Sequence, residues 1–126
     1  PLMVRDYQKT LPNTIQREWF DQTKLTEEIK QEYLKIFQIE NWDRAFYELT
    51  FAPAYPELRP LLPQLTVPVF IVAGQEDRLI RAWYFEAIAT EIPDAELTLI
   101  PQCGHVQQVE CPALFMQAVV QYLDKQ

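Results

Sequence analysis

An acid and a base are the residues of this sequence whose chemistry stands out. Asp77 follows an apolar run at residues 67–73. His105, the only histidine of the chain, follows a second apolar run at residues 97–100. A neutral imidazole accepts a proton near neutral pH, and a carboxylate on its other ring nitrogen fixes the tautomer and stabilises the imidazolium. We therefore predict that Asp77 and His105 are the acid and base of a hydrolytic triad.

Two strands and the helix between them must position this pair. Residues 67–73 are apolar on both alternations, which is typical of a parallel strand buried on two faces. Apolar residues at helical spacing then predict a helix up to Pro93, and residues 97–100 form the second strand. A β-helix-β order implies a right-handed parallel unit. The carboxyl ends of both strands then share one edge of the sheet, where open α/β sheets place their sites.

Helices are predicted on both sides of this unit. The expected segments are a short helix over residues 14–20 with Ile15, Trp19 and Phe20 inward, a helix capped by Thr26 that ends near Gln38, a helix capped by Asn41 and ended by Pro53, a short irregular segment from Pro56, and a last helix from Pro112 to Leu123. Residues 1–25 as a whole lack a regular period. We divide the chain into a helical cap segment at 1–63 and an α/β core at 64–126.

Composition limits the classes of protein to consider. The chain has 126 residues, 48% of them hydrophobic and 23% charged, which indicates one small globular domain and not a disordered chain. The net charge of −7 argues against nucleic acid and anionic membranes as partners. No apolar run approaches the ~20 residues of a transmembrane helix, and no signal peptide is visible. Two cysteines exclude a disulfide scaffold and favour the cytoplasm.

The acid and base lie in motifs that resemble a known family. Residues 68–77 are similar to the last-but-one strand of the α/β-hydrolase fold, in which an apolar strand, a glycine and two further residues precede the catalytic Asp. Residues 92–101 and Gly104-His105 resemble the final strand and the catalytic His loop, and Glu110 and Pro112 match the usual sequence after it. The resemblance implies an α/β fold with parallel strands and flanking helices, the C-terminal portion of this hydrolase fold, preceded by a helical cap. It also implies hydrolysis of an ester or a related small apolar substrate, with epoxide, haloalkane and carbon–carbon hydrolysis left open.

The chain lacks the family's nucleophile. A Gly-x-Ser-x-Gly elbow is absent, and Arg81 and Gln102 stand where a proline and a small residue often occur. The nucleophile precedes the acid and the His in this fold, so we expect it upstream of Pro1, on a missing N-terminal half that acts as the partner of this chain. A start at Pro1 and only two predicted strands indicate a C-terminal piece of a larger protein. Alone, this piece should be inactive.

Other residues of the chain are also candidates for a site. Trp42, Phe46 and Val106 are candidate substrate-binding residues, although aromatics at helical spacing are more often core. Glu76 is the rival acid and is expected to be solvated. A Cys103–His105 dyad, a Cys103–Cys111 disulfide and a zinc site are all disfavoured, and no metal or cofactor is expected. The alternative function is a non-catalytic interaction module, with an exposed strand edge that favours a partner chain or a homo-oligomer.

Overall fold

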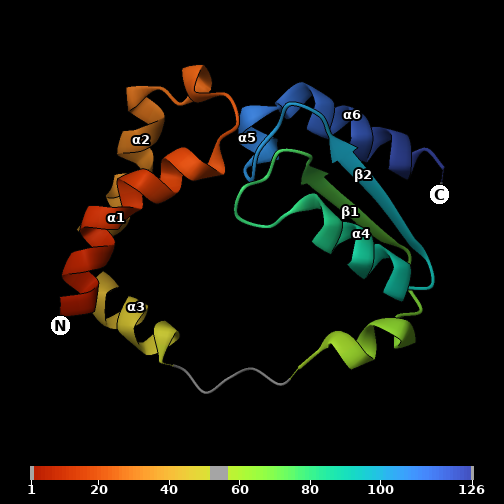
Figure 1. Ribbon diagram of the computed structural model, residues 1–126, viewed down its shortest axis with the longest axis horizontal. Coiled ribbons are helices and arrows are strands. Elements are labelled where there is room, and N and C mark those ends of the chain that lie inside the picture. Colours follow the sequence, from red (N-terminus) through yellow and green to blue (C-terminus); the bar gives the residue numbers. More distant parts are fainter. Residues whose placement is uncertain (1, 52–56, 126) are drawn as a thin grey trace.

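The computed structural model describes residues 2–51 and 57–125, in which helices precede a two-stranded sheet (Figure 1). The elements are α1 (Leu2–Glu18), η1 (Gln22–Lys24), α2 (Glu27–Leu34), η2 (Lys35–Gln38), α3 (Trp42–Thr50), η3 (Arg59–Gln64), β1 (Val69–Gly74), α4 (Ala82–Glu91), β2 (Ala95–Ile100), α5 (Gln107–Glu110) and α6 (Pro112–Leu123), where η marks a 3₁₀ helix. None of the helices within these two ranges has both the length and the apolar character that crossing a lipid bilayer requires.

The sheet confirms the predicted parallel unit. β1 pairs with β2 in parallel, from Val69 opposite Ala95 to Gly74 opposite Ile100. The strands differ from the predicted ranges by about two residues at their first positions, where apolar patterning is weakest. α4 packs against both strands, α6 also contacts both, and Figure 1 shows the sheet lying between these two helices. The carboxyl ends of β1 and β2 consequently lie side by side.

The helical region is better ordered than its sequence pattern suggests. The helix predicted over residues 14–20 is the last part of a longer helix, because α1 has 17 residues, contains Pro12 and ends at Glu18. Ile15 and Trp19 are buried as predicted, and Phe20 is half-buried. Leu11 and Ile15 lie one turn apart on one face of α1, and Trp19 directly follows the helix; all three are buried together with Leu25. Tyr33 of α2 packs against this cluster. Burial there, together with the nearby Glu18 carboxylate, raises the pKa of Tyr33 to about 12.

Two predicted helix starts are found in the structure. The Thr26 hydroxyl accepts a hydrogen bond from the backbone N–H of Ile29 at 3.3 Å, as an N-cap does. The helix ends earlier than expected and continues as η2 to Gln38. Asn41 is the N-cap residue of α3, but in a left-handed conformation with φ 59° and without a side-chain cap bond. Pro53 and Pro56 lie outside the described residues.

Candidate active site

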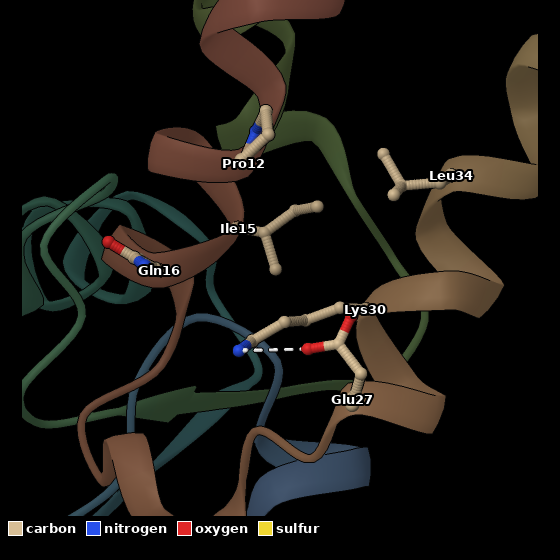
Figure 2. Close-up of a pocket in the computed structure, with 6 residues that line it drawn as sticks. All are labelled: Pro12, Ile15, Gln16, Glu27, Lys30 and Leu34. Atoms are coloured by element: carbon tan, nitrogen blue, oxygen red, sulfur yellow. Dashed lines mark ion pairs between the residues drawn. The ribbon is translucent and has the colours of Figure 1, made fainter.

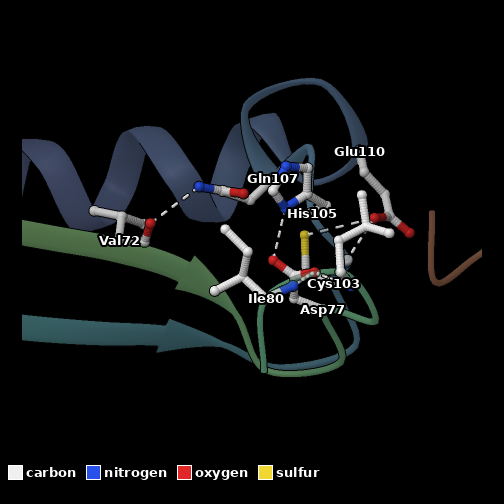
Figure 3. Close-up of polar contacts among 9 residues, drawn as sticks. Val72, Asp77, Ile80, Cys103, His105, Gln107 and Glu110 are labelled. Atoms are coloured by element: carbon white, nitrogen blue, oxygen red, sulfur yellow. Dashed lines mark hydrogen bonds and ion pairs between the residues drawn. The ribbon is translucent and has the colours of Figure 1, made fainter. Parts of the chain in front are cut away.

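The structure brings Asp77 and His105 together at the carboxyl ends of the strands. Asp77 lies in the turn after β1, and His105 lies in the loop after β2. Figure 3 shows the two side chains facing each other, with His105 Nδ1 2.8 Å from Asp77 Oδ2. The distance is that of a charge-assisted hydrogen bond. A residue pair 28 positions apart in the sequence is therefore in direct contact.

The surroundings fix the carboxylate and leave the imidazole accessible. Asp77 is 3% exposed, and its Oδ1 accepts hydrogen bonds from the N–H groups of Leu79 and Ile80 at 2.7 and 2.9 Å. The His105 side chain is 33% exposed. With Nδ1–H donated to Asp77, Nε2 is left as the proton acceptor, and within the described ranges no protein group bonds to it. The imidazole is thus oriented for proton transfer through Nε2.

Both glycines of the chain are needed where backbones approach closely. A Cβ on Gly74 would overlap the Gly104 carbonyl group and lie 2.7 Å from the carbonyl carbon of Cys103. A Cβ on Gly104 would overlap the Glu18 carbonyl and lie 2.8 Å from the Phe20 nitrogen. Because real Cβ contacts are longer, any side chain would separate these segments. The turn carrying the acid, the loop carrying the base and the end of α1 therefore pack backbone to backbone.

Two further carboxylates stabilise the loop before His105. The expectation that Glu76 is solvated is wrong: it is half-buried, and its Oε2 accepts a hydrogen bond from the N–H of Cys103 at 3.1 Å. Glu110 is only 2% exposed and accepts from the N–H of Gly104 at 2.7 Å. Sequence reasoning noted Glu110 as part of a motif but gave it no role. The signal was an acid beside a tight glycine loop, where backbone N–H groups lack partners within a helix or strand.

The start of α5 is attached to the sheet. Figure 3 shows the Gln107 side chain reaching toward β1, where its Nε2 donates a hydrogen bond to the Val72 carbonyl at 3.0 Å. Val106, the residue between His105 and Gln107, packs against the buried cluster of α1. These two contacts place the residues after His105 between the sheet and the helical region.

The two cysteines form a disulfide, so the expectation against this pair is wrong. The short helix α5 turns the chain back and brings the Cα atoms of Cys103 and Cys111 to 6.3 Å, within the usual range for a disulfide. Cys103 therefore has no thiol to act with His105. Glu110 and the two cysteines have ligand atoms within 4.8 Å of one another, but sulfurs bonded to each other are not thiolate ligands.

The substrate-binding candidates are not all gathered at the pair. Trp42 and Phe46 line an apolar hollow of about 280 Å³ beside α3. Asp77 lines a different hollow of about 350 Å³, together with Phe20 and Trp83. The two hollows have no lining residue in common. Of the three candidates, only Val106 is adjacent to His105 in the sequence.

A third hollow, of about 250 Å³, lies between α1 and α2 (Figure 2). Ile15 and Leu34 form its apolar walls, and Figure 2 shows an ion pair between Lys30 and Glu27, with the nitrogen 3.5 Å from the carboxylate oxygen. Neither Asp77 nor His105 lines it. It has no part in the geometry of the acid and base.

Comparison with known proteins identifies relatives that are considerably longer. The chain is 38% identical over 63 residues to a 2-hydroxy-6-oxononadienedioate/2-hydroxy-6-oxononatrienedioate hydrolase of Pseudomonas sp, covering 50% of this chain and 22% of that protein. A structure of a thermophilic esterase from Thermogutta terrifontis matches 56% of this chain and 26% of its own, with 34% identity and a TM-score of 0.54. An esterase from Exiguobacterium antarcticum matches 95% of this chain and 44% of its own, with 18% identity and a TM-score of 0.76.

The chain spans between 22% and 37% of the length of the curated relatives it matches. The fold of this chain nevertheless agrees over almost its whole length with part of the Exiguobacterium structure. The model of the alpha/beta hydrolase family matches residues 2–120, a range that includes the helical segment, both strands, Asp77 and His105. The chain belongs to the alpha/beta hydrolase family.

Proposed function

We propose that this chain supplies the acid and base of an α/β-fold hydrolase whose nucleophile lies on an N-terminal half of the same protein. The observation that carries the proposal is the contact between His105 Nδ1 and a buried Asp77, with Nε2 free of protein partners in the described ranges. The chain contains no serine and no Gly-x-Ser-x-Gly elbow, and its two cysteines are bonded in a disulfide. These absences support a nucleophile on another part of the complete protein.

The geometry suits a two-stage ester hydrolysis. His105 Nε2 accepts the proton of a nucleophile hydroxyl as that oxygen bonds to the ester carbonyl carbon, and then gives the proton to the leaving alkoxide. Water next attacks the acyl-enzyme, its proton passes to Nε2, and the nucleophile oxygen recovers it as the acid is released. The Asp77 carboxylate accepts a hydrogen bond from Nδ1–H throughout and stabilises the imidazolium that forms in each stage.

An ester or a related small apolar molecule is the substrate class we propose. The esterase from Thermogutta terrifontis and the Pseudomonas hydrolase support hydrolysis as the reaction. Trp42 and Phe46 are proposed to contact the apolar part of the substrate, because the hollow that they line is almost entirely apolar. Val106 is proposed as a contact beside the base, because it directly follows His105. Whether the nucleophile is a serine or an aspartate separates the serine hydrolases from the rest of the family.

A fluorophosphonate probe tests the proposal on the product of the complete gene. We expect the probe to label one serine outside the sequence of this chain, and the isolated 126-residue chain to hydrolyse no ester. Hydrolysis by the isolated chain that depends on His105 would place a nucleophile within it. A complete product without a serine or aspartate nucleophile would favour the interaction module instead.

The proposed N-terminal half has an edge available to it. In the described residues the sheet has only the strands β1 and β2, and a two-stranded sheet is marginally stable alone. Met116, Val120 and Leu123 of α6 are about half exposed, which leaves apolar surface for a partner or for a second copy. Sedimentation of the isolated chain tests this: a homo-oligomer supports self-association, and a monomer supports covering by the missing half.

The disulfide bears on the predicted cytoplasmic location. Disulfides persist mainly in oxidising compartments, so the bond between Cys103 and Cys111 counts against a cytoplasmic protein. Alkylation of thiols before cell lysis, followed by mass spectrometry, measures the state directly. Two alkylated cysteines per chain would support the cytoplasmic prediction. A chain with no alkylated cysteine would contradict it.

A further inference from the structure

Glu110 joins the loop that carries the base to a distant part of the chain. Its side chain is buried, and Figure 3 shows it pointing toward the loop that carries Cys103 and His105. Its two carboxylate oxygens accept hydrogen bonds from different segments. Oε2 accepts from the N–H of Gly104, the residue before His105, at 2.7 Å. Oε1 accepts from the N–H of Asp21, which follows α1, also at 2.7 Å. One carboxylate thus holds together two backbone segments that lie more than eighty positions apart.

Neighbouring contacts strengthen the same connection. The N–H of His105 itself donates to the Glu18 carbonyl, at the end of α1, at 2.6 Å. The Lys24 ammonium donates to the Glu110 carbonyl at 3.1 Å. The absence of a side chain at Gly104 permits this approach, since a Cβ there would meet the backbone of Glu18. The backbone of the base is consequently held by residues 18–24 as well as by its own loop.

We propose that Glu110 is a positioning residue through which residues 18–24 set the place of His105. The proposal rests on the proposed function of His105 as the base. Glu110 does not contact the imidazole or any reacting atom. It acts through the backbone N–H groups of Asp21 and Gly104, which both donate to its carboxylate. The imidazole of His105 then lies at hydrogen-bond distance from Asp77 only while residues 18–24 are packed against the loop before His105. The helical segment before the sheet thereby contributes to placing the base.

A carboxylate is required at this position for a definite reason. Both partners are N–H donors, and a carboxylate offers an acceptor to each. A glutamine of the same size has one acceptor oxygen and one NH₂ group, which would face a backbone N–H. One buried donor would then lack a partner, and an unsatisfied buried donor is strongly disfavoured. Glu110→Gln should therefore separate the two segments without emptying the space that the side chain fills.

The experiment compares Glu110→Gln with Asp21→Asn in the product of the complete gene. Asp21 is the matched control because only its backbone N–H bonds Glu110, while its side chain bonds Thr23. We expect Glu110→Gln to lower kcat by about 10- to 100-fold, because a small displacement of a catalytic group slows the reaction. KM should change less than about threefold, because Glu110 does not contact the substrate. Asp21→Asn should keep both parameters.

Proton NMR gives a readout that needs no nucleophile. The Nδ1 proton shared between His105 and Asp77 should give a strongly downfield signal in the wild type and none in Asp77→Asn. We expect Glu110→Gln to weaken or shift this signal while circular dichroism and the unfolding transition still report a folded protein. An unchanged signal together with an unchanged kcat would overturn the positioning role.

Asp21→Pro covers the case in which Glu110→Gln does not fold. Proline removes the N–H that Oε1 accepts from and leaves Glu110 in place, so we expect the same direction of change relative to Asp21→Asn. A signal and kcat equal to those of Asp21→Asn would reject the proposal. If the wild type hydrolyses nothing but Glu110→Gln still alters the NMR signal, the proposed function fails and the positioning role stands. If the wild type hydrolyses esters and Glu110→Gln keeps both the wild-type kcat and the wild-type NMR signal, the positioning role fails and the proposed function stands.

Discussion

The helical region at residues 7–51 and the strand–loop region at residues 69–123 are held together by different interactions. In the helical region the contacts are apolar and aromatic, such as the stacking of Tyr7 on Phe46 with ring centroids 4.1 Å apart. At the strand ends, buried carboxylates bond to backbone N–H groups and to one imidazole. Apolar packing responds to lost volume, whereas the polar network responds to a single changed atom. The two regions should therefore fail in different ways.

The largest effect is expected from His105→Ala. Loss of the base should lower kcat for an ester by a factor on the order of 10⁴ or more in the product of the complete gene. Gln108→Ala, an exposed neighbour in the same segment, is the control and should keep normal turnover. Steady-state kinetics with a chromogenic ester measures both. Equal rates for His105→Ala and the wild type would reject the triad assignment.

Asp77→Asn should be nearly as damaging to kcat and mild for the fold. The Asn oxygen can still accept from the N–H groups of Leu79 and Ile80, so the turn is preserved. The NH₂ group would face Nδ1 and favour the wrong tautomer of His105, which lowers kcat by roughly 10³- to 10⁴-fold. Glu76→Gln removes the rival acid and should cost far less. A larger loss in Glu76→Gln would move the role of acid to Glu76.

In the helical region, Ile15→Ala should affect stability more than rate. Ile15 is 2% exposed in the cluster on α1, and truncating such a side chain costs about 2–5 kcal/mol of the free energy of unfolding. Gln16→Ala, on the exposed side of α1, should cost little. Urea unfolding gives the free energies, and kcat is measured well below the unfolding midpoint. A fall in kcat above about tenfold for folded Ile15→Ala would show that the regions are not separable.

The smallest effect is expected from Phe46→Ala, and it falls on binding. If Phe46 contacts the apolar part of the substrate, losing that contact should raise KM for a longer-chain ester by about three- to tenfold with kcat unchanged. Tyr47→Ala is the control, because Tyr47 lies on α3 but does not line the hollow. A series of esters of increasing chain length measures the difference. Equal KM values for both variants would remove Trp42 and Phe46 from the substrate site.

The same division explains what the sequence could predict. β1, β2, α4 and α6 follow from patterns within a dozen residues, namely apolar runs, helical spacing and a starting proline. The meeting of Asp77 and His105 follows from one rule, because parallel strands end at the same edge. Each of these features depends on local sequence and on a topology with few alternatives.

Features that depend on distant contacts were not predictable. α1 lacks a clean period and contains Pro12, and it is stabilised by packing of Leu11, Ile15 and Trp19 on segments that follow it. Glu110 is recognisable in the sequence as part of a motif, but its role depends on Asp21, which only the fold brings to it from near the other end of the chain. The disulfide depends on the turn that α5 makes between the two cysteines, and no residue pattern predicted this turn. Burial in these places is a property of the assembled fold and not of the local sequence.

The contact between Gly74 and Gly104 has a consequence for mutational surveys of this protein. Neither glycine has a functional group, yet a single added methyl would push the strand end away from the loop. Asp77 follows the first glycine by three positions and His105 follows the second by one, so both would be displaced. A scan scored by activity alone would rank these two positions beside the acid and the base. Intolerance to substitution here would reflect spacing between main chains and would give no information about chemistry.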